Sequence, residues 1–126
     1  MQQNFDIGMD TADTVIRAWQ YRKQDIGVTL NLGRRNGKKY FRLLQQQSHE
    51  IKSELGDSLE WDEKPNQKDS RITIRNSNTD TTNEEDWQKQ YEWLASKVEL
   101  FYRTFKPRIE TFKMAVRESP ENGDDE

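Results

Sequence analysis

The sequence predicts a small α+β domain in which an antiparallel sheet of about four strands carries two helices on one face. Residues 15–33 and 59–76 each contain a pair of short runs in which apolar and polar residues alternate, as they do in strands. Residues 87–116 instead place apolar residues at steps of three and four, which is the period of an α-helix. The expected order is therefore hairpin, helix, hairpin, helix, which favours a two-layer sandwich.

The composition indicates one domain with a small core. At 126 residues the chain has the length of a single domain, which we place at residues 1–118, with residues 1–12 unpatterned. Charged residues make up 34% of the chain and apolar residues 31%, a polarity close to that of chains that stay unfolded. Four Trp, four Tyr and five Phe compensate for the small number of apolar residues, because each ring can bury about 150–250 Å². We therefore expect a flat core that is rich in aromatic rings.

Charge is distributed unevenly along the chain. Residues 118–126 hold five carboxylates and no basic side chain, and we expect residues 119–126 to form a disordered acidic tail. Subtracting this −5 from the net charge of −3 leaves +2 for residues 1–117. A mildly basic body permits an anionic partner without requiring one.

Residue types that the chain lacks exclude several classes of function. It contains no cysteine, so disulfides, thiolate nucleophiles and cysteine-bound zinc are ruled out. No run approaches the roughly 18 apolar residues of a membrane-spanning helix, and the N-terminal residues lack the pattern of a signal peptide. We therefore expect a cytoplasmic protein without membrane contact, and we expect no cofactor.

Both hairpins are predicted from alternating residues. Residues 15–21 carry apolar groups on both faces, and residues 26–33 alternate Ile, Val and Leu with small or polar residues. The polar residues 22–25 between them suit a hairpin loop. The second hairpin is predicted at residues 59–63 and 71–76, joined by a polar loop that contains Pro65.

The first helix is predicted after the turn signal Asn36-Gly37. Apolar or small residues then recur at steps of three and four, and Gly56 is placed to end the helix in a left-handed conformation. The predicted helix face comprises Phe41, Leu44, Ser48, Ile51 and Leu55.

The second helix is predicted to begin at a capping box. Thr82 can accept a hydrogen bond from the amide of Glu85, whose side chain can reach back to Thr82. Pro107 predicts a kink or a restart near Phe105, because a proline ring costs about 3 kcal/mol inside a helix. The apolar stripe stays in phase beyond the proline, which favours a kink. This stripe comprises Trp87, Tyr91, Leu94, Val98, Phe101, Phe105, Ile109, Phe112 and Val116.

Short segments spread over roughly residues 26–112 carry a family resemblance. They are Tyr40-Phe41-Arg42-Leu43-Leu44, Glu50-Ile51, Glu54-Leu55-Gly56, Leu59-Glu60-Trp61, Ser70-Arg71-Ile72, Trp87, Trp93-Leu94 and Phe105-Lys106-Pro107-Arg108. Together these segments resemble the bacterial and archaeal family named domain of unknown function 4268. Members of that family occur alone or after a restriction-endonuclease-like nuclease domain. The resemblance implies a DNA-related or defence-related setting, and it supplies no catalytic residues.

A basic turn is the first candidate site. Its five basic residues lie within nine positions at a glycine-flanked turn that enters a helix: Arg34, Arg35, Lys38, Lys39 and Arg42. Free amides at a helix N-terminus bind phosphate, whereas lysines there oppose the helix dipole by about 0.3–1 kcal/mol each unless an anion compensates. Nucleic-acid binding is therefore one hypothesis. The alternative is a solvated turn that keeps the sheet edge soluble or pairs with the acidic tail.

Two further clusters suit catalysis poorly. Asp62-Glu63-Lys64, with Asp57 upstream, matches the end of a nuclease motif in which two carboxylates hold Mg²⁺. Its short spacing and the proline that follows favour an ordinary charged loop. His49 is the only histidine, and its neighbours Ser48 and Glu50 diverge from it around a helix, so the three form no relay. We expect no metal site and no enzymatic activity.

One apolar pair off the main stripe predicts an interface. Trp93 and Leu100 lie seven residues apart and about 120–140° from the stripe of the last helix. If exposed, they form a ridge typical of interfaces, with Trp93 as its hot spot. The alternative is that both flanks of the helix pack within the domain.

The sequence thus favours a non-catalytic protein-interaction or accessory module that binds itself or an unknown protein through Trp93 and Leu100. The expected setting, bacterial DNA processing or phage defence, comes from the family resemblance alone. The alternatives are a nucleic-acid-binding domain at the basic turn and a metal-dependent nuclease at Asp57, Asp62 and Lys64.

Overall fold

A computed structural model shows an α+β fold, as the sequence predicts. It describes residues 3–8, 14–21, 25–33, 36–56, 59–63 and 69–118. For residues 3–8, 21 and 116–118 it describes the backbone alone. The predicted acidic tail at residues 119–126 and the loop with Pro65 lie outside these ranges.

Five antiparallel strands form one sheet. They are β1 (Gln3–Gly8), β2 (Thr14–Tyr21), β3 (Asp25–Leu32), β4 (Glu60–Asp62) and β5 (Ser70–Asn76). Their order across the sheet is β1-β2-β3-β5-β4. β2 pairs with β3 and β4 pairs with β5, so both predicted hairpins are confirmed. β3 and β5 join the hairpins, with Ile26 opposite Asn76 and Leu32 opposite Ser70.

The fifth strand corrects the expectation that residues 1–12 are unpatterned. β1 pairs with β2 along its whole length, with Phe5 opposite Ala18 and Ile7 opposite Ile16. Its sequence, QNFDIG, includes Asn, Asp and Gly, which are uncommon in strands. Pairing with β2 therefore determines this strand more than the propensity of its own residues, and β1 forms one edge of the sheet.

The two faces of the sheet differ in polarity. Along β3, Ile26, Val28, Leu30 and Leu32 are fully buried, which confirms the alternation that predicted this strand. On the opposite face, Thr29 forms hydrogen bonds with Trp19 and Thr73, at 3.0 and 2.9 Å. An antiparallel sheet with one apolar and one polar face needs a cover on one side only.

The helices begin with α1 (Gly37–Gln45) and α2 (Ser48–Leu55), where the sequence predicts a single helix. The chain leaves the helical conformation at Gln47, with φ −107° and ψ 20°. The Gln47 amide donates to the Leu44 carbonyl at 2.9 Å, a three-residue step. No glycine or proline marks this break. Instead Arg108, far along the chain, donates to Gln47 Oε1 at 2.7 Å, so a tertiary contact supports the turn.

Gly56 ends α2 as predicted. It adopts a left-handed conformation with φ 70°, and its amide donates to the Lys52 carbonyl at 2.8 Å. Side chains with a Cβ resist this conformation, so glycine is the residue best suited to this position.

The last helix begins differently from the predicted capping box. A 3₁₀ turn, η1 (Glu84–Asp86), leads directly into α3 (Trp87–Glu118). Asn83 is the N-cap, because its side chain accepts a hydrogen bond from the Glu85 amide at 3.1 Å. The Thr82 hydroxyl instead donates to Asp80 Oδ1 at 2.5 Å. The predicted role of Thr82 as the cap is therefore wrong, because its hydroxyl is hydrogen-bonded to the Asp80 carboxylate.

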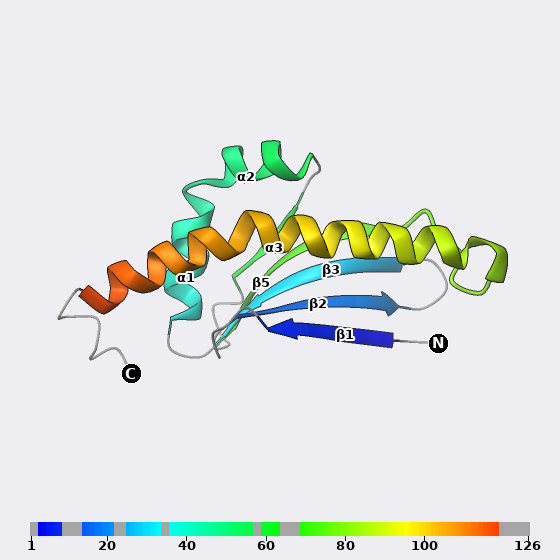
Figure 1. The fold of residues 1–126 in the computed structure, drawn as a ribbon, viewed down its shortest axis with the longest axis horizontal. Coiled ribbons are helices and arrows are strands. Elements are labelled where there is room, and N and C mark those ends of the chain that lie inside the picture. The colour runs from blue at the N-terminus through cyan, green and yellow to red at the C-terminus, as the bar shows by residue number, and fades with distance from the viewer. Residues whose placement is uncertain are drawn as a thin grey trace.

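α3 continues through Pro107 without interruption, so a restart near Phe105 is wrong. Figure 1 shows that the helix axis bends toward its C-terminal end. Side chains supply hydrogen bonds around the proline: Arg108 Nη1 donates to the Thr104 carbonyl at 2.7 Å, and Thr111 Oγ1 donates to the Pro107 carbonyl at 3.0 Å.

The middle of the predicted stripe forms the core contact of α3. Its buried members are Leu94, Phe101, Phe105, Ile109 and Phe112. α3 contacts β2 and β3, while α1 contacts β3 and β5. Figure 1 shows α2 on one side of α3 and β1 and β2 on the other, while α1 crosses α3 near its C-terminal end. The helical layer therefore covers the sheet unevenly.

Arg108 ties α3 to the α1–α2 corner. Besides its bond to Gln47, it forms a two-pronged ion pair with Glu54, with N–O distances of 2.6 and 3.1 Å. The Arg108 side chain is 17% exposed, so its charge is well shielded from water and the paired carboxylate matters to the fold.

Gly37→Ala should destabilise the domain, whereas Gly33→Ala should leave its stability nearly unchanged. A Cβ on Gly37 would meet the backbone of Leu32, whose carbonyl carbon would lie 2.6 Å away, while a Cβ on Gly33 would have no neighbour closer than 3.6 Å. We expect losses of about 1–3 kcal/mol for Gly37→Ala and below about 0.5 kcal/mol for Gly33→Ala, measured by urea denaturation. Equal effects would contradict the close approach.

Glu54→Gln should lower stability at neutral pH, and its difference from the wild type should shrink in acid. Hydrogen bonds from Arg108, with the Arg108 charge, hold the pKa of the Glu54 carboxyl below its ordinary value despite desolvation. Such a carboxylate stabilises the fold above the unfolded pKa of about 4.3, and the contribution is lost as the pH falls through the lower folded pKa. Urea denaturation from neutral pH to about pH 3 checks this. A difference that stays constant would show that the ion pair does not form.

Candidate functional site

An apolar groove runs along one flank of α3. Its volume is about 510 Å³, within the roughly 300–1,000 Å³ typical of ligand sites. The surface that its walls expose is apolar. The residues that line it are Ala18, Tyr91, Leu94, Ala95, Val98, Glu99 and Tyr102. All but Ala18 come from α3, so the groove lies where this helix meets β2.

The spacing of the helix residues explains the apolar wall. Tyr91, Ala95, Val98 and Tyr102 follow one another at steps of four, three and four, so they share one flank of α3, about 50–110° around the helix from its buried side. Tyr91 is 44% exposed, Ala95 is exposed, and Val98 and Tyr102 are half-buried. The small side chain of Ala95 leaves the middle of the flank hollow.

The floor of the groove is the part of the sheet that the other helices leave open. Ala18, on β2, is 5% exposed and packs beneath α3. α2 lies on the far side of α3, and α1 crosses α3 nearer its C-terminal end (Figure 1). Within the described residues no helix covers β1. The groove therefore forms because its floor residue, Ala18, is small and because no described helix covers the sheet on this side of α3.

Charged side chains lie on the groove wall and next to it on α3: Glu99 is a lining residue, and Glu92 precedes it by seven residues. Glu92 is exposed, and Glu99 forms an ion pair with Arg103 one turn further along α3. At the end of the groove, Lys106 Nζ donates to the Tyr102 hydroxyl at 2.7 Å and lies 4.9 Å from the ring centroid. Pairs within one exposed helix contribute only about 0.2–0.5 kcal/mol, so these side chains can turn toward a partner.

The predicted interface residues lie on the other flank of α3. Trp93 and Leu100 are half-buried and pack against the core, and Lys97 Nζ lies 5.8 Å from the ring centroid of Trp93. Among the large apolar side chains, Trp87 and Tyr91 are more exposed, at 37% and 44%. Periodicity assigns both to the core, because it does not show where the sheet beneath the helix ends.

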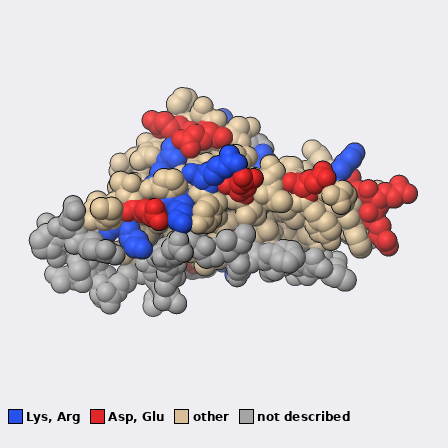
Figure 2. Space-filling model, in the orientation of Figure 1, with Lys and Arg blue, Asp and Glu red and all other residues tan. Residues whose placement is uncertain are grey.

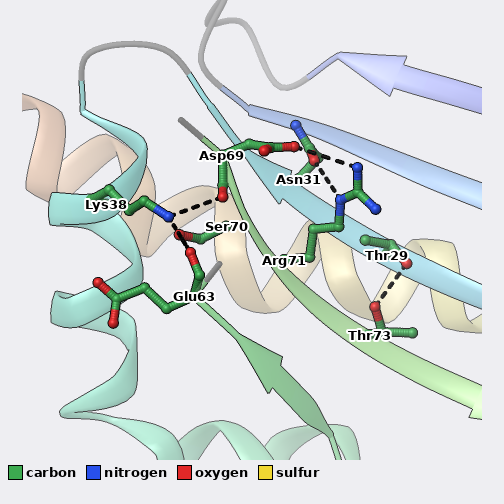
Figure 3. Close-up of polar contacts among 8 residues, drawn as sticks. All are labelled: Thr29, Asn31, Lys38, Glu63, Asp69, Ser70, Arg71 and Thr73. Atoms are coloured by element: carbon green, nitrogen blue, oxygen red, sulfur yellow. Dashed lines mark hydrogen bonds and ion pairs between the residues drawn. The ribbon is translucent and has the colours of Figure 1, made fainter. Parts of the chain in front are cut away.

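Part of the predicted basic turn holds the fold together. Lys38 Nζ donates hydrogen bonds to the backbone carbonyl groups of Glu63 and Asp69, the latter at 3.0 Å (Figure 3). Ser70 Oγ donates to the same Glu63 carbonyl at 2.8 Å. These bonds join the first turn of α1 to the ends of β4 and β5. Carbonyl oxygens, rather than a phosphate, therefore compensate this lysine at the start of its helix.

The other basic residues of the turn are divided between known and undescribed positions. Arg42 Nη2 lies 2.8 Å from Glu63 Oε2. Lys39 is half-buried and makes a polar or electrostatic contact of its own. Arg34 and Arg35 lie outside the described residues. Figure 2 shows acidic and basic side chains intermixed over the visible described surface. Nucleic-acid binding at this turn stays a prediction.

The remaining candidates are exposed or undescribed. Asp57 and Lys64 lie outside the described residues, Asp62 is exposed on β4, and His49 and Glu50 are exposed on α2. Within the described ranges, no three His, Asp or Glu side chains are grouped to hold a metal ion. The helices described here also include none long and apolar enough to cross a bilayer.

Lys38→Met should destabilise the domain by about 1–3 kcal/mol, because it removes the donor to two backbone carbonyl groups and keeps the aliphatic part of the side chain. Lys52→Met, on the exposed face of α2, is the matched control and should change stability by less than about 0.5 kcal/mol. Chemical denaturation of both variants measures the difference. Equal stability of the two would refute the structural role of Lys38.

One family model matches most of the chain. The family is described as a domain of unknown function (DUF4268), and the match covers residues 3–109, which include all five strands and the groove. No curated protein and no solved structure matches the chain. The family match confirms the resemblance seen in the segments between residues 40 and 108. Because it spans well over half of the sequence, the chain belongs to the DUF4268 family.

Proposed function

We propose that this domain is a non-catalytic protein-interaction module that acts in bacterial DNA processing or phage defence. The groove beside α3 is the observation that supports an interaction role, since apolar surface bordered by charged residues is typical of binding sites. An apolar wall binds another surface but offers little acid–base chemistry. The setting rests on the family resemblance alone.

The groove is also suited to a protein partner by its residue types and its rigidity. Tyr91 and Tyr102 stand at its two ends, and tyrosine is enriched among residues that dominate binding energy. The buried rings of Phe101 and Phe105 on the same helix anchor it to the sheet. A surface held in place in this way loses little conformational entropy on binding.

Self-association through Trp93 and Leu100 is a separate and weaker proposal. Both residues already pack against the core, so a partner could bury only what remains exposed of each. The flank that carries Tyr91 and Ala95 instead forms an apolar groove, and Tyr91 is 44% exposed. We therefore place the main interaction site on the groove side of α3.

A photo-activated crosslinking residue at Glu99 should join this protein to a specific partner in the cells that produce it. The same residue at Ser53, exposed on α2 and away from the groove, is the matched control and should not capture that partner. Mass spectrometry identifies the captured protein. Ala95→Arg should lower its capture at least about tenfold, since a bulky charge would fill the hollow.

Three outcomes would contradict the interaction role: no capture at Glu99, equal capture at Ser53, or capture that Ala95→Arg leaves unchanged. Circular dichroism of the Ala95→Arg variant checks that it folds. Because Ala95 is exposed, we expect the substitution to leave stability within about 0.5 kcal/mol of the wild type.

A further inference from the structure

We infer that the groove beside α3 receives an amphipathic helix of another protein, with basic residues along one border of its apolar face. This inference rests on the proposed function and specifies the chemistry of the partner. Four observations carry it: the spacing of the wall, the open part of the helical layer, the apolar character of the groove and the carboxylates beside it.

The wall has the shape that a neighbouring helix requires. Side chains at steps of four and three form a ridge, and ridges of adjacent helices interlock at axis separations of about 8–10 Å. The ridge from Tyr91 to Tyr102 is about 16 Å long, or three turns. Ala95 lies at its centre and is exposed, so a partner side chain can enter there. The same 4-3-4 spacing on the partner would match it.

Within the described part of the chain, the helical layer has room for one more element. α3 lies over β2 and β3, and α1 lies over β3 and β5. Beyond α3 the sheet continues through β2 to its edge at β1, where the backbone of Phe5 pairs with Ala18. A helix set against the ridge would lie above these two strands and extend the two-layer packing that the domain already uses.

A second copy of α3 does not fit this place in an antiparallel arrangement. Two antiparallel α3 helices related by a twofold axis would have both of their sheets on the same side of the pair. In each copy the sheet extends beyond α3 through β1, with strands about 4.8 Å apart. The two β1 edges would therefore meet before the helices came within packing distance. A partner helix without a sheet beneath it avoids this clash.

A small molecule also suits the groove less well than a helix. Small ligands are oriented by a few polar groups placed inside their pockets, whereas the surface exposed in this groove is apolar. Glu99 is the one charged residue of the lining, and it lies at the border, where it adds no polar surface to the groove. An occupant long enough to follow the ridge and wide enough to reach that border can use both features.

Two exposed carboxylates lie beside the middle of the groove. Glu92 and Glu99 are both exposed and lie seven residues apart, which places them on the same side of the ridge. Their partners within α3, Gln88 and Arg103, hold them only weakly. Lys106 lies further along α3 and donates a hydrogen bond to the Tyr102 hydroxyl. Charge complementarity therefore favours lysine or arginine on the partner, at seven-residue spacing.

Two synthetic helices of about 18 residues, five turns, can test this inference. Both helices have the same leucine face. In the first helix lysine residues flank this face, and in the second helix glutamate residues occupy the same positions. The wild-type protein should bind the lysine-bordered helix at least about tenfold more tightly, measured by fluorescence anisotropy. Glu92→Lys with Glu99→Lys should reverse the preference, and Ala95→Arg should weaken binding of both helices.

A matched variant separates the local effect from net charge. Glu50→Lys with Glu110→Lys makes the same change in charge on α2 and near the end of α3, at exposed positions outside the groove lining, and it should keep the lysine preference. Equal affinity for the two helices, a glutamate preference, or a reversal by this control would overturn the inference. Position-specific crosslinking at Glu99 without a lysine preference would overturn only the partner chemistry. Absent crosslinking would overturn the interaction role itself.

Discussion

The packing of the aromatic stripe of α3 onto β2 and β3 is the contact on which the rest of this domain depends. With 31% apolar residues, the chain has few side chains from which to build a core. Phe101 and Phe105 are fully buried, with ring centroids 5.1 Å apart in an edge-to-face arrangement. Such ring pairs add about 0.5–1.5 kcal/mol beyond the area they bury. Tyr40 extends the cluster toward Phe112, so α1 is packed against the same helix.

One long helix cannot cover a sheet of five strands, and the candidate site follows from that mismatch. α2 lies on the side of α3 away from β1, and α1 crosses α3 near its C-terminal end (Figure 1). The bonds from Arg108 to Glu54 and Gln47 hold the α1–α2 corner against α3. The side toward β1 has no such cover in the described part of the chain, and small residues, Ala18 and Ala95, lie there. One face of α3 therefore packs in the core, and the neighbouring flank of the same helix lines the groove.

The charged residues show how tertiary contacts change the meaning of a motif. Lys38 belongs to a basic run in the sequence, but its ammonium group is bound by the carbonyl groups of Glu63 and Asp69. Arg42 likewise pairs with Glu63. Both cations thus help to fasten α1 to the β4–β5 hairpin. A run of like charges in a sequence cannot reveal this, because the acceptors are backbone atoms more than twenty residues away.

The sequence by itself determined the two hairpins, the long aromatic helix and the glycine that ends α2, because each depends on local periodicity or on one residue's backbone freedom. Tertiary structure decided the rest. β1 exists because β2 pairs with it, the chain breaks at Gln47 where Arg108 binds it, and Asn83 caps the helix because Asp80 engages Thr82. The groove, too, depends on tertiary structure. Periodicity tells which residues share a side of α3, but only the position of α3 over the sheet decides that Leu94 is buried while Tyr91 stays exposed.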